Sequence, residues 1–165
     1  MTDTPVLVGL AEIQALNGAA MLTCLGLGSC VSVCALDPVA NVSGMAHIML
    51  PQSNPRSNSN KPGTFADTGV QELVNSMEAL GADRSRLVCA VAGGASTCTH
   101  IGMDFGKRTA DAVVQKLKAL GVKCAAADLG GTVGRSVTMS TDSGNVTVNT
   151  INMGESVLCS LREAA

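Results

Sequence analysis

The sequence predicts an α+β protein in which strands dominate and two helices pack on one side. Three observations support this prediction. Short apolar runs end at glycine or proline, two amphipathic segments carry a helical apolar stripe, and the C-terminal region alternates around a turn. Strands accompanied by a few helices on one side are typical of the α+β class. The length of 165 residues fits one domain, which we expect to span residues 1–165.

The first third of the chain is predicted to form strands. The run VLVGLAEIQAL (6–16) predicts one strand or a pair of short strands, and AMLTCLGLG then leads into a glycine-rich turn. VSVCALD (31–37) and MAHIML (45–50) are apolar runs that stop at prolines, so each predicts a strand. The segment PQSNPRSNSNKPG (51–63) is polar and rich in proline and asparagine, which predicts a loop.

Two helices follow, each with one apolar stripe at helical spacing. Gly81 and Gly121 come directly after the two stripes, where a glycine commonly ends a helix. Each helix leads into a strand that ends in a glycine pair, RLVCAVAGG (86–94) and VKCAAADLGG (122–131). The stripes consist of Val70, Leu73, Val74, Met77 and Leu80, and of Ala110, Val113, Val114, Leu117 and Leu120.

The tail of the chain predicts a β-hairpin. SVTMSTDSGNVTVNTI (136–151) alternates between apolar and polar residues on both sides of a DSG turn. Arg135 immediately precedes this segment. We interpret it as one member of an ion pair at the start of the strand, and contact with substrate, which the spacing does not support, is the alternative.

Composition and charge exclude several classes of protein. Apolar residues make up 46% of the chain and charged residues 15%, so the chain is not disordered. A net charge of −2, with neither Trp nor Tyr, disfavours nucleic-acid binding. The N-terminus lacks the basic region of a signal peptide, and no clean membrane-spanning run occurs. We therefore expect a cytoplasmic protein that does not insert into a membrane.

Cys30 is the strongest candidate for a nucleophile. It follows two glycines and a serine in GLGSC, and such a turn gives a side chain access to substrate. Backbone amides around Gly28 and Ser29 can then stabilise an oxyanion. The chain has only two histidines, His47 and His100, and His47 reaches Cys30 if their strands form a hairpin. A buried histidine bonded to a backbone carbonyl remains the alternative for His47.

Other residues near this motif have two interpretations each. Cys30, Cys34 and His47 are conceivable zinc ligands, but they lack the usual spacing and an obvious fourth ligand, so we expect no metal. The seven cysteines are odd in number and lack C-x-x-C spacing, so most are expected in the core. Gly93 and Gly94 are explained either by a substrate cleft or by a tight turn.

Several motifs together carry a resemblance to a known family. They are GLGSCVSVCALDP with GMAHIMLP, KPGTFADTGV (61–70), VAGGAS (91–96), Ile-Gly-Met and Phe-Gly-Lys-Arg within 101–108, and DLGGTVGRSV (128–137). With these motifs, the sequence resembles the CheD family of chemoreceptor glutamine deamidases over nearly its whole length. The resemblance implies a layered β-sheet sandwich with two helices packed on one side, similar to the cysteine-dependent toxin deamidases.

The resemblance also implies roles for individual residues. The family nucleophile falls on Cys30 and its histidine on His47. The family has a third residue, a threonine six positions before the nucleophile, where this chain has Cys24 and the neighbouring threonine is Thr23. A backbone carbonyl that orients His47 is the alternative for this third role.

The implied activity is hydrolysis of glutamine amides, and of glutamyl methyl esters, on the helical cytoplasmic region of chemoreceptors, without a cofactor. The resemblance also implies a second role, binding and stimulation of a CheC-type phosphatase. An unrelated cysteine amidase or esterase acting on small molecules is the third interpretation.

Overall fold

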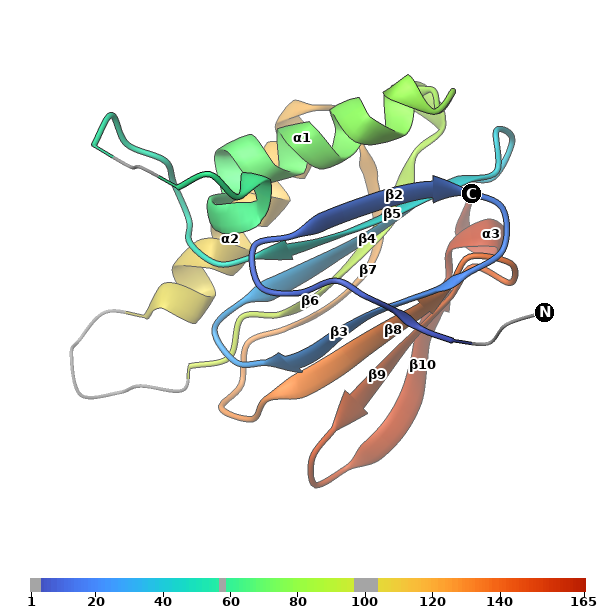
Figure 1. The fold of residues 1–165 in the computed structure, drawn as a ribbon. Helices are drawn as coiled ribbons and strands as arrows, with labels where there is room; N and C mark the ends of the chain where they lie inside the picture. The colour runs from blue at the N-terminus through green and yellow to red at the C-terminus, as the bar shows by residue number, and fades with distance from the viewer. Residues whose placement is uncertain (1–3, 57–58, 97–103) are drawn as a thin grey trace.

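The protein consists of two stacked β-sheets with helices on one side. In the computed structural model, which describes residues 4–56, 59–96 and 104–165, ten strands form two five-stranded sheets. The first sheet has the order β2-β5-β4-β6-β7, and the second has the order β1-β3-β8-β9-β10. Helices α1 and α2 cover the face of the first sheet that points away from the second sheet (Figure 1). The predicted α+β class and the layered sandwich are therefore confirmed.

The elements have the following bounds. The first sheet contains β2 (Ile13–Asn17), β4 (Val31–Asp37), β5 (Val42–Ile48), β6 (Val88–Gly93) and β7 (Lys123–Leu129). The second contains β1 (Val6–Leu7), β3 (Met21–Leu27), β8 (Arg135–Ser140), β9 (Asn145–Thr150) and β10 (Gly154–Ser160). The α-helices are α1 (Ala66–Ala79), α2 (Phe105–Ala119) and α3 (Leu161–Ala164), and 3₁₀ turns span Pro62–Thr64 and Arg84–Arg86.

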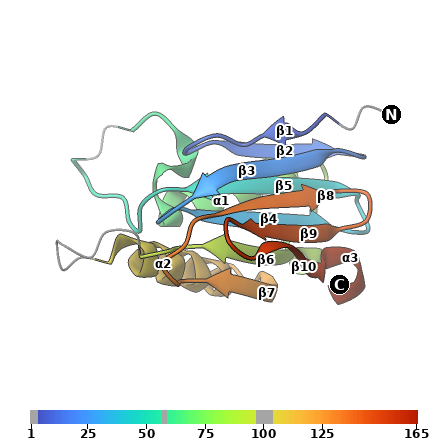
Figure 2. The ribbon, with the colours of Figure 1, turned by 90° about the horizontal axis from the view of Figure 1, so that it is seen from below.

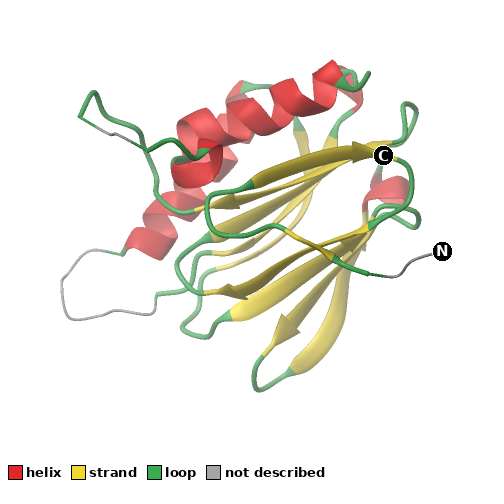
Figure 3. Cartoon of the chain, in the orientation of Figure 1, coloured by secondary structure: helices red, strands yellow, loops and turns green. Residues whose placement is uncertain are grey.

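Strand β4 lies at the centre of the protein and supplies both of its apolar cores. Val31 and Val33 point toward the helices, whereas Cys34 and Leu36 point toward the second sheet. Every residue of β4 is buried, because a strand between two layers is covered on both faces. This position explains why VSVCALD is an almost continuous apolar run. Figure 3 shows the two layers of strands, with the long helices above one of them.

The predicted helices and hairpins are largely confirmed. Gly81 and Gly121 follow α1 and α2 with φ angles of 105° and 72°, a region that glycine enters without steric cost. The run 6–16 forms two short strands, and the C-terminal hairpin consists of β8 and β9. Strand β5 begins earlier than expected, because Asn41 at φ 55° closes a tight turn that starts the ladder at Val42.

Strand β10 and helix α3 were not predicted. The outer part of β10 is exposed on both faces, so its sequence GESVLCS lacks the alternation that predicts a half-buried strand. Helix α3 has only four residues, which is too short for a helical stripe. In the described residues, no helix is both long and apolar enough to cross a membrane.

A buried carboxylate ties the β4–β5 turn to the segment before β6. Asp37 accepts hydrogen bonds from the amides of Val39, Ala40 and Asp83 and pairs with Arg86 at 2.9 Å. Burial by itself raises the pKa of Asp37, but the hydrogen bonds from Arg86 and the amides outweigh it and lower the pKa to about 2.

We expect the Asp37→Asn variant to lose about 3 kcal/mol of unfolding free energy at neutral pH, because Arg86 and the amides lose their anion. A lowered pKa contributes stability above pH 3.8, and this contribution disappears as the pH falls toward 2. The difference between the variant and the wild type should therefore shrink in acid. Urea unfolding measures it, and the exposed Asp111→Asn on α2 is the control. A constant difference from pH 7 to pH 3 would contradict the assignment.

Candidate active site

Cys30 and His47 line the same cavity. Cys30 lies in the turn between β3 and β4, directly before β4, and His47 is the penultimate residue of β5. The cavity has a volume of about 290 Å³ and opens beside β1 and β3. Its lining consists of Leu7, Val8, Gly9, Leu10, Thr23, Leu25, Gly26, Cys30 and His47.

The ladder between β4 and β5 brings the two side chains together. Ser32 is the direct partner of His47, and Cys30 lies two residues before Ser32 on the same face. Diagonal neighbours of this kind have Cα atoms about 7–8 Å apart, within reach of a thiol and an imidazole. The hairpin on which a contact between His47 and Cys30 depends is thus present, because β4 and β5 pair antiparallel.

His47 is held by backbone groups from the segment after β1. Its side chain is buried, and Nδ1 lies 3.2 Å from the carbonyl oxygen of Val8, while its backbone N–H donates to the carbonyl of Glu12 at 3.0 Å. Burial lowers the pKa of His47, and the Val8 carbonyl and the Glu12 charge oppose this shift only in part. His47 is therefore neutral at pH 7. If Nδ1 donates to Val8, Nε2 is free to accept a proton.

Cys30 rests as a thiol. Its side chain is half-buried, and burial raises the pKa of the thiol above its ordinary value. A neutral imidazole beside a protonated thiol does not form a standing ion pair. Such an arrangement is suited to general-base activation of a nucleophile, in which the proton would move from sulfur to His47 as the sulfur attacks.

Two glycines shape the turn that carries Cys30. The amide of Gly94 donates to the Cys30 carbonyl at 2.9 Å, and the amide of Ala95 donates to the Gly28 carbonyl at 2.9 Å. Gly93 and Gly94 are buried beneath the turn and do not belong to the cavity lining. A substrate-cleft role for them stays a prediction. Outside the strand ladders, no described residue accepts a hydrogen bond from the amide of Ser29 or Cys30. Gly28 and Ser29 are not part of the cavity lining, and an oxyanion-binding role for this turn stays a prediction.

The Gly93→Ala variant is expected to lose about 3 kcal/mol of unfolding free energy together with the geometry of the Cys30 turn. A Cβ on Gly93 would meet the Cys30 carbonyl oxygen at 2.3 Å, and the φ angle of 118° adds strain. Thermal unfolding measures the loss. The Gly81→Ala variant is the matched control, because Gly81 has a similar φ of 105° with open space around it, so its cost is limited to about 1–2 kcal/mol. Equal losses would contradict the steric argument.

Cys24 and Thr23, the two candidates for the third residue of the site, lie in different surroundings. Cys24 is completely buried between the sheets, where burial raises the pKa of its thiol to about 12. Thr23 lines the cavity, and its hydroxyl donates to the carbonyl of Val137 at 2.9 Å. The group in contact with His47 Nδ1 is the carbonyl of Val8. Sequence reasoning missed Val8, because a backbone carbonyl leaves no side-chain signal.

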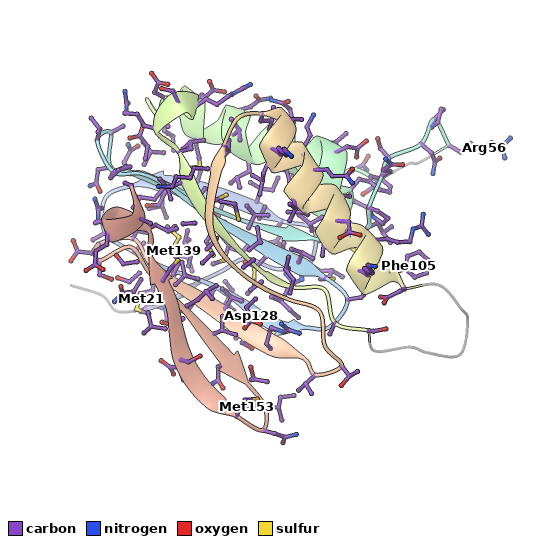
Figure 4. The ribbon with its side chains drawn as sticks, turned by 180° about the vertical axis from the view of Figure 1, so that it is seen from behind. Met21, Arg56, Phe105, Asp128, Met139 and Met153 are labelled. Carbon is purple, nitrogen blue, oxygen red and sulfur yellow. The ribbon has the colours of Figure 1, made fainter. Side chains whose placement is uncertain are left out.

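The remaining candidates lie outside this cavity. Cys34 is buried between the sheets, and Arg135 pairs with Asp128 of β7 at 3.0 Å, as expected for an ion pair at the start of a strand. Asp128 is labelled in Figure 4. His100 lies outside the described residues. Within the described residues, no group of three or more His, Cys, Asp or Glu side chains is arranged to hold a metal ion.

Comparison with known proteins identifies close relatives. Residues 49–150 match the family model described as CheD chemotactic sensory transduction. The chain is 42% identical over 148 residues to "Chemoreceptor glutamine deamidase CheD" of Thermotoga maritima, covering 90% of this chain and 93% of that protein. Two proteins named "Probable chemoreceptor glutamine deamidase CheD", from Desulfitobacterium hafniense and Archaeoglobus fulgidus, are each 39% identical and cover 92% and 91% of this chain and 96% of their own length.

The aligned regions extend beyond the family model. The alignment with the Thermotoga maritima protein spans 90% of the chain, so the part left out is too short to reach Cys30 from the N-terminus or His47 from the C-terminus. The segment from Cys30 to His47 is therefore aligned. Among solved structures, the Bacillus licheniformis hypothetical protein YfiH covers 93% of this chain and 43% of its own at 17% identity, with a TM-score of 0.34, which is too low to support an argument.

Proposed function

The chain belongs to the CheD family, and we propose that it hydrolyses the side-chain amide of glutamine residues in chemoreceptors to give glutamate. The observation that carries this proposal is the cavity lined by both the Cys30 thiol, directly before β4, and the neutral His47 imidazole on the adjacent strand β5. The names of the relatives support chemoreceptors as the substrate. Such a substrate places the reaction in the cytoplasm, where the modified receptor helices lie.

The proposed reaction uses only groups of the chain and water. His47 Nε2 takes the proton of Cys30, and the sulfur attacks the carbon of the glutamine amide. The amides of Ser29 and Cys30 stabilise the oxyanion, a contribution of about 3 kcal/mol for each donor. His47 then protonates the leaving nitrogen, and ammonia departs from a thioester on Cys30. Water, deprotonated by His47, hydrolyses the thioester to glutamate and restores the thiol.

The same steps apply to a glutamyl methyl ester. The oxygen leaving group departs more readily than nitrogen, and the ester has nearly the shape of glutamine. We therefore include ester hydrolysis in the proposal.

Three exposed leucines form an apolar rim around the cavity and support a helical substrate. Leu7, Leu10 and Leu25 are 61%, 50% and 60% exposed, and all three line the cavity that contains Cys30. Exposed apolar side chains gathered at one opening mark an interaction site. An amphipathic receptor helix can place its apolar face on this rim while one glutamine side chain enters the cavity.

The Leu25→Asp variant is expected to lower kcat/KM for a receptor fragment about 10-fold, because a charge on the rim disfavours the apolar face of the helix. The effect should lie mainly in KM, since Leu25 does not touch the reacting atoms. Steady-state kinetics on a receptor fragment measure the change. Val39→Asp is the matched control, because Val39 is 73% exposed but lies in the β4–β5 turn away from the cavity. Equal effects of the two substitutions would show that the rim does not bind the substrate.

The test of the proposed function is peptide mapping of a chemoreceptor cytoplasmic fragment by mass spectrometry. Incubation with the wild-type protein should convert particular glutamines to glutamate and release ammonia in equal amount. A short glutamine-containing peptide and a small ester serve as parallel substrates. Turnover of the small substrates without receptor deamidation would instead favour a small-molecule amidase or esterase, and no turnover of any substrate would contradict the proposal.

The proposal also includes binding of a CheC-type phosphatase. The apolar rim would serve receptor and phosphatase alike, so the two should compete for it. A Cys30→Ala protein should still bind the phosphatase in a pull-down, whereas Leu25→Asp should weaken that binding. Binding that is unaffected by Leu25→Asp and by excess receptor fragment would place the phosphatase on another surface.

A further inference from the structure

A second pair of reactive side chains lies toward the edge of the first sheet that β7 forms. The central strand β4 separates this pair from β5, which carries His47. Cys89 of β6 and Cys124 of β7 are direct partners in the parallel ladder. Directly paired residues lie about 4.8 Å apart between strands. A disulfide bridges Cα atoms about 4.4–6.8 Å apart, so the spacing of directly paired strand residues falls within the range that a disulfide spans. Both cysteines are free thiols in the structure.

The two thiols differ in access but face each other. Cys89 is completely buried, and its Sγ donates to the carbonyl of Lys123, the residue before Cys124, at 3.2 Å. Cys124 is exposed on β7, the edge strand of the sheet (Figure 2). The ladder changes register directly after this pair, so Ala125 has no partner. A small oxidant can therefore reach Cys124 first, with Cys89 in place behind it.

We propose that Cys89 and Cys124 form a hydroperoxide-sensitive dithiol that closes to a disulfide between β6 and β7. The proposal concerns an oxidation site separate from the Cys30 cavity and does not depend on the deamidase activity. Neither cysteine lines that cavity.

The chemistry takes place in two balanced steps. The Cys124 sulfur attacks one peroxide oxygen, the O–O bond breaks, and the departing hydroxide takes up a proton as water, leaving a sulfenic acid on Cys124. The Cys89 sulfur then attacks the Cys124 sulfur, the S–O bond breaks, and the hydroxide leaves with the Cys89 proton as a second water. Two thiols lose two electrons in total, and one hydroperoxide gains them.

The electrostatic environment supports this order of events. The adjacent Cys89 thiol lowers the pKa of Cys124 below its ordinary value, which favours the thiolate form of Cys124. The same interaction raises the pKa of Cys89, which keeps Cys89 protonated until Cys124 has reacted. Cys124 is thus the attacking sulfur and Cys89 the resolving one.

Cys159 of β10 is the competing partner. It is partly buried and close enough to Cys124 for their charges to interact, but it lies in the other sheet and is not its ladder partner. The geometry favours Cys89, because only the ladder fixes a short distance between the backbones of the two residues.

The test is treatment of the Cys30→Ser protein with a small excess of hydrogen peroxide at pH 7.5, followed by alkylation and peptide mapping without reduction. The Cys30→Ser background removes oxidation of the active-site thiol. The expected product is a cross-linked peptide pair joining Cys89 to Cys124, formed before any other oxidation and reversed by dithiothreitol.

Three variants in the same background make the test specific. Cys159→Ser should retain the cross-link, and the surface change Cys124→Ser should abolish it. Cys89→Ala should stop the reaction at a sulfenic acid on Cys124 that dimedone captures, and circular dichroism shows whether this core variant is folded. A Cys124–Cys159 cross-link, or overoxidation of Cys124 in the Cys30→Ser protein without a cross-link, would overturn the proposal.

Discussion

The Cys30→Ala variant is expected to deamidate a receptor fragment at least about 10⁴-fold more slowly than the wild type, with its fold intact. The reason is that every bond-making step of the proposed mechanism passes through the Cys30 sulfur. Without it, the neutral His47 and the free amides of the turn can activate and stabilise only a direct attack by water. The residual rate should therefore be close to that of the uncatalysed reaction.

Stability separates loss of chemistry from loss of structure in this variant. Cys30 is half-buried in a turn whose backbone is fixed by Gly94 and Ala95, so removing its sulfur should change the unfolding free energy by less than about 1 kcal/mol. Ammonia release under saturating fragment measures activity, and thermal unfolding measures stability. Cys124→Ala is the matched control, because Cys124 is an exposed thiol outside the cavity and should keep full activity without oxidant. Deamidation by Cys30→Ala at more than a few per cent of the wild-type rate would assign the nucleophile elsewhere.

The cavity could be predicted only in part from the sequence. From the sequence, a contact between His47 and Cys30 depended on a hairpin between their strands, and the antiparallel ladder of β4 and β5 provides that hairpin. The apolar rim could not be predicted, because Leu7 and Leu25 are brought together by the parallel pairing of β1 with β3. Such a long-range pairing has no local pattern in a two-residue strand.

The third residue of the site could not be placed from the sequence for a different reason. Counting back six positions from the nucleophile gives Cys24, yet alternation along β3 buries Cys24 between the sheets and leaves Thr23 at the cavity. The register shift between Cys24 and Leu27 decides how these side chains are placed relative to Cys30, and a bulge of this kind is a tertiary feature. The contact from Val8 to His47 is equally invisible in the sequence, since any residue there supplies a carbonyl.

The His47→Gln variant should lower kcat about 10³-fold, because glutamine fills the site but cannot accept the Cys30 proton. Its pH profile should also change. In the wild type, kcat/KM should rise with pH as His47 loses its proton, with a midpoint that burial shifts below the ordinary 6.5. In the variant, catalysis requires that Cys30 ionise without a general base. The midpoint of its pH profile should then follow the pKa of the Cys30 thiol, which burial raises above the ordinary 9.0. The rising limb should therefore move by more than two pH units, as measured by ammonia release from pH 5 to pH 10.

Stability provides an independent check on the same residue. A histidine whose folded pKa is lowered takes up its proton more readily in the unfolded chain, so the wild type loses stability as the pH falls below about 6.5. The His47→Gln variant lacks this loss, and its unfolding free energy should be flatter between pH 7 and pH 5.5. A rising limb that stays below pH 6.5 in the variant would show that another group accepts the Cys30 proton, and His47 would then be a buried residue that only supports the Val8 segment.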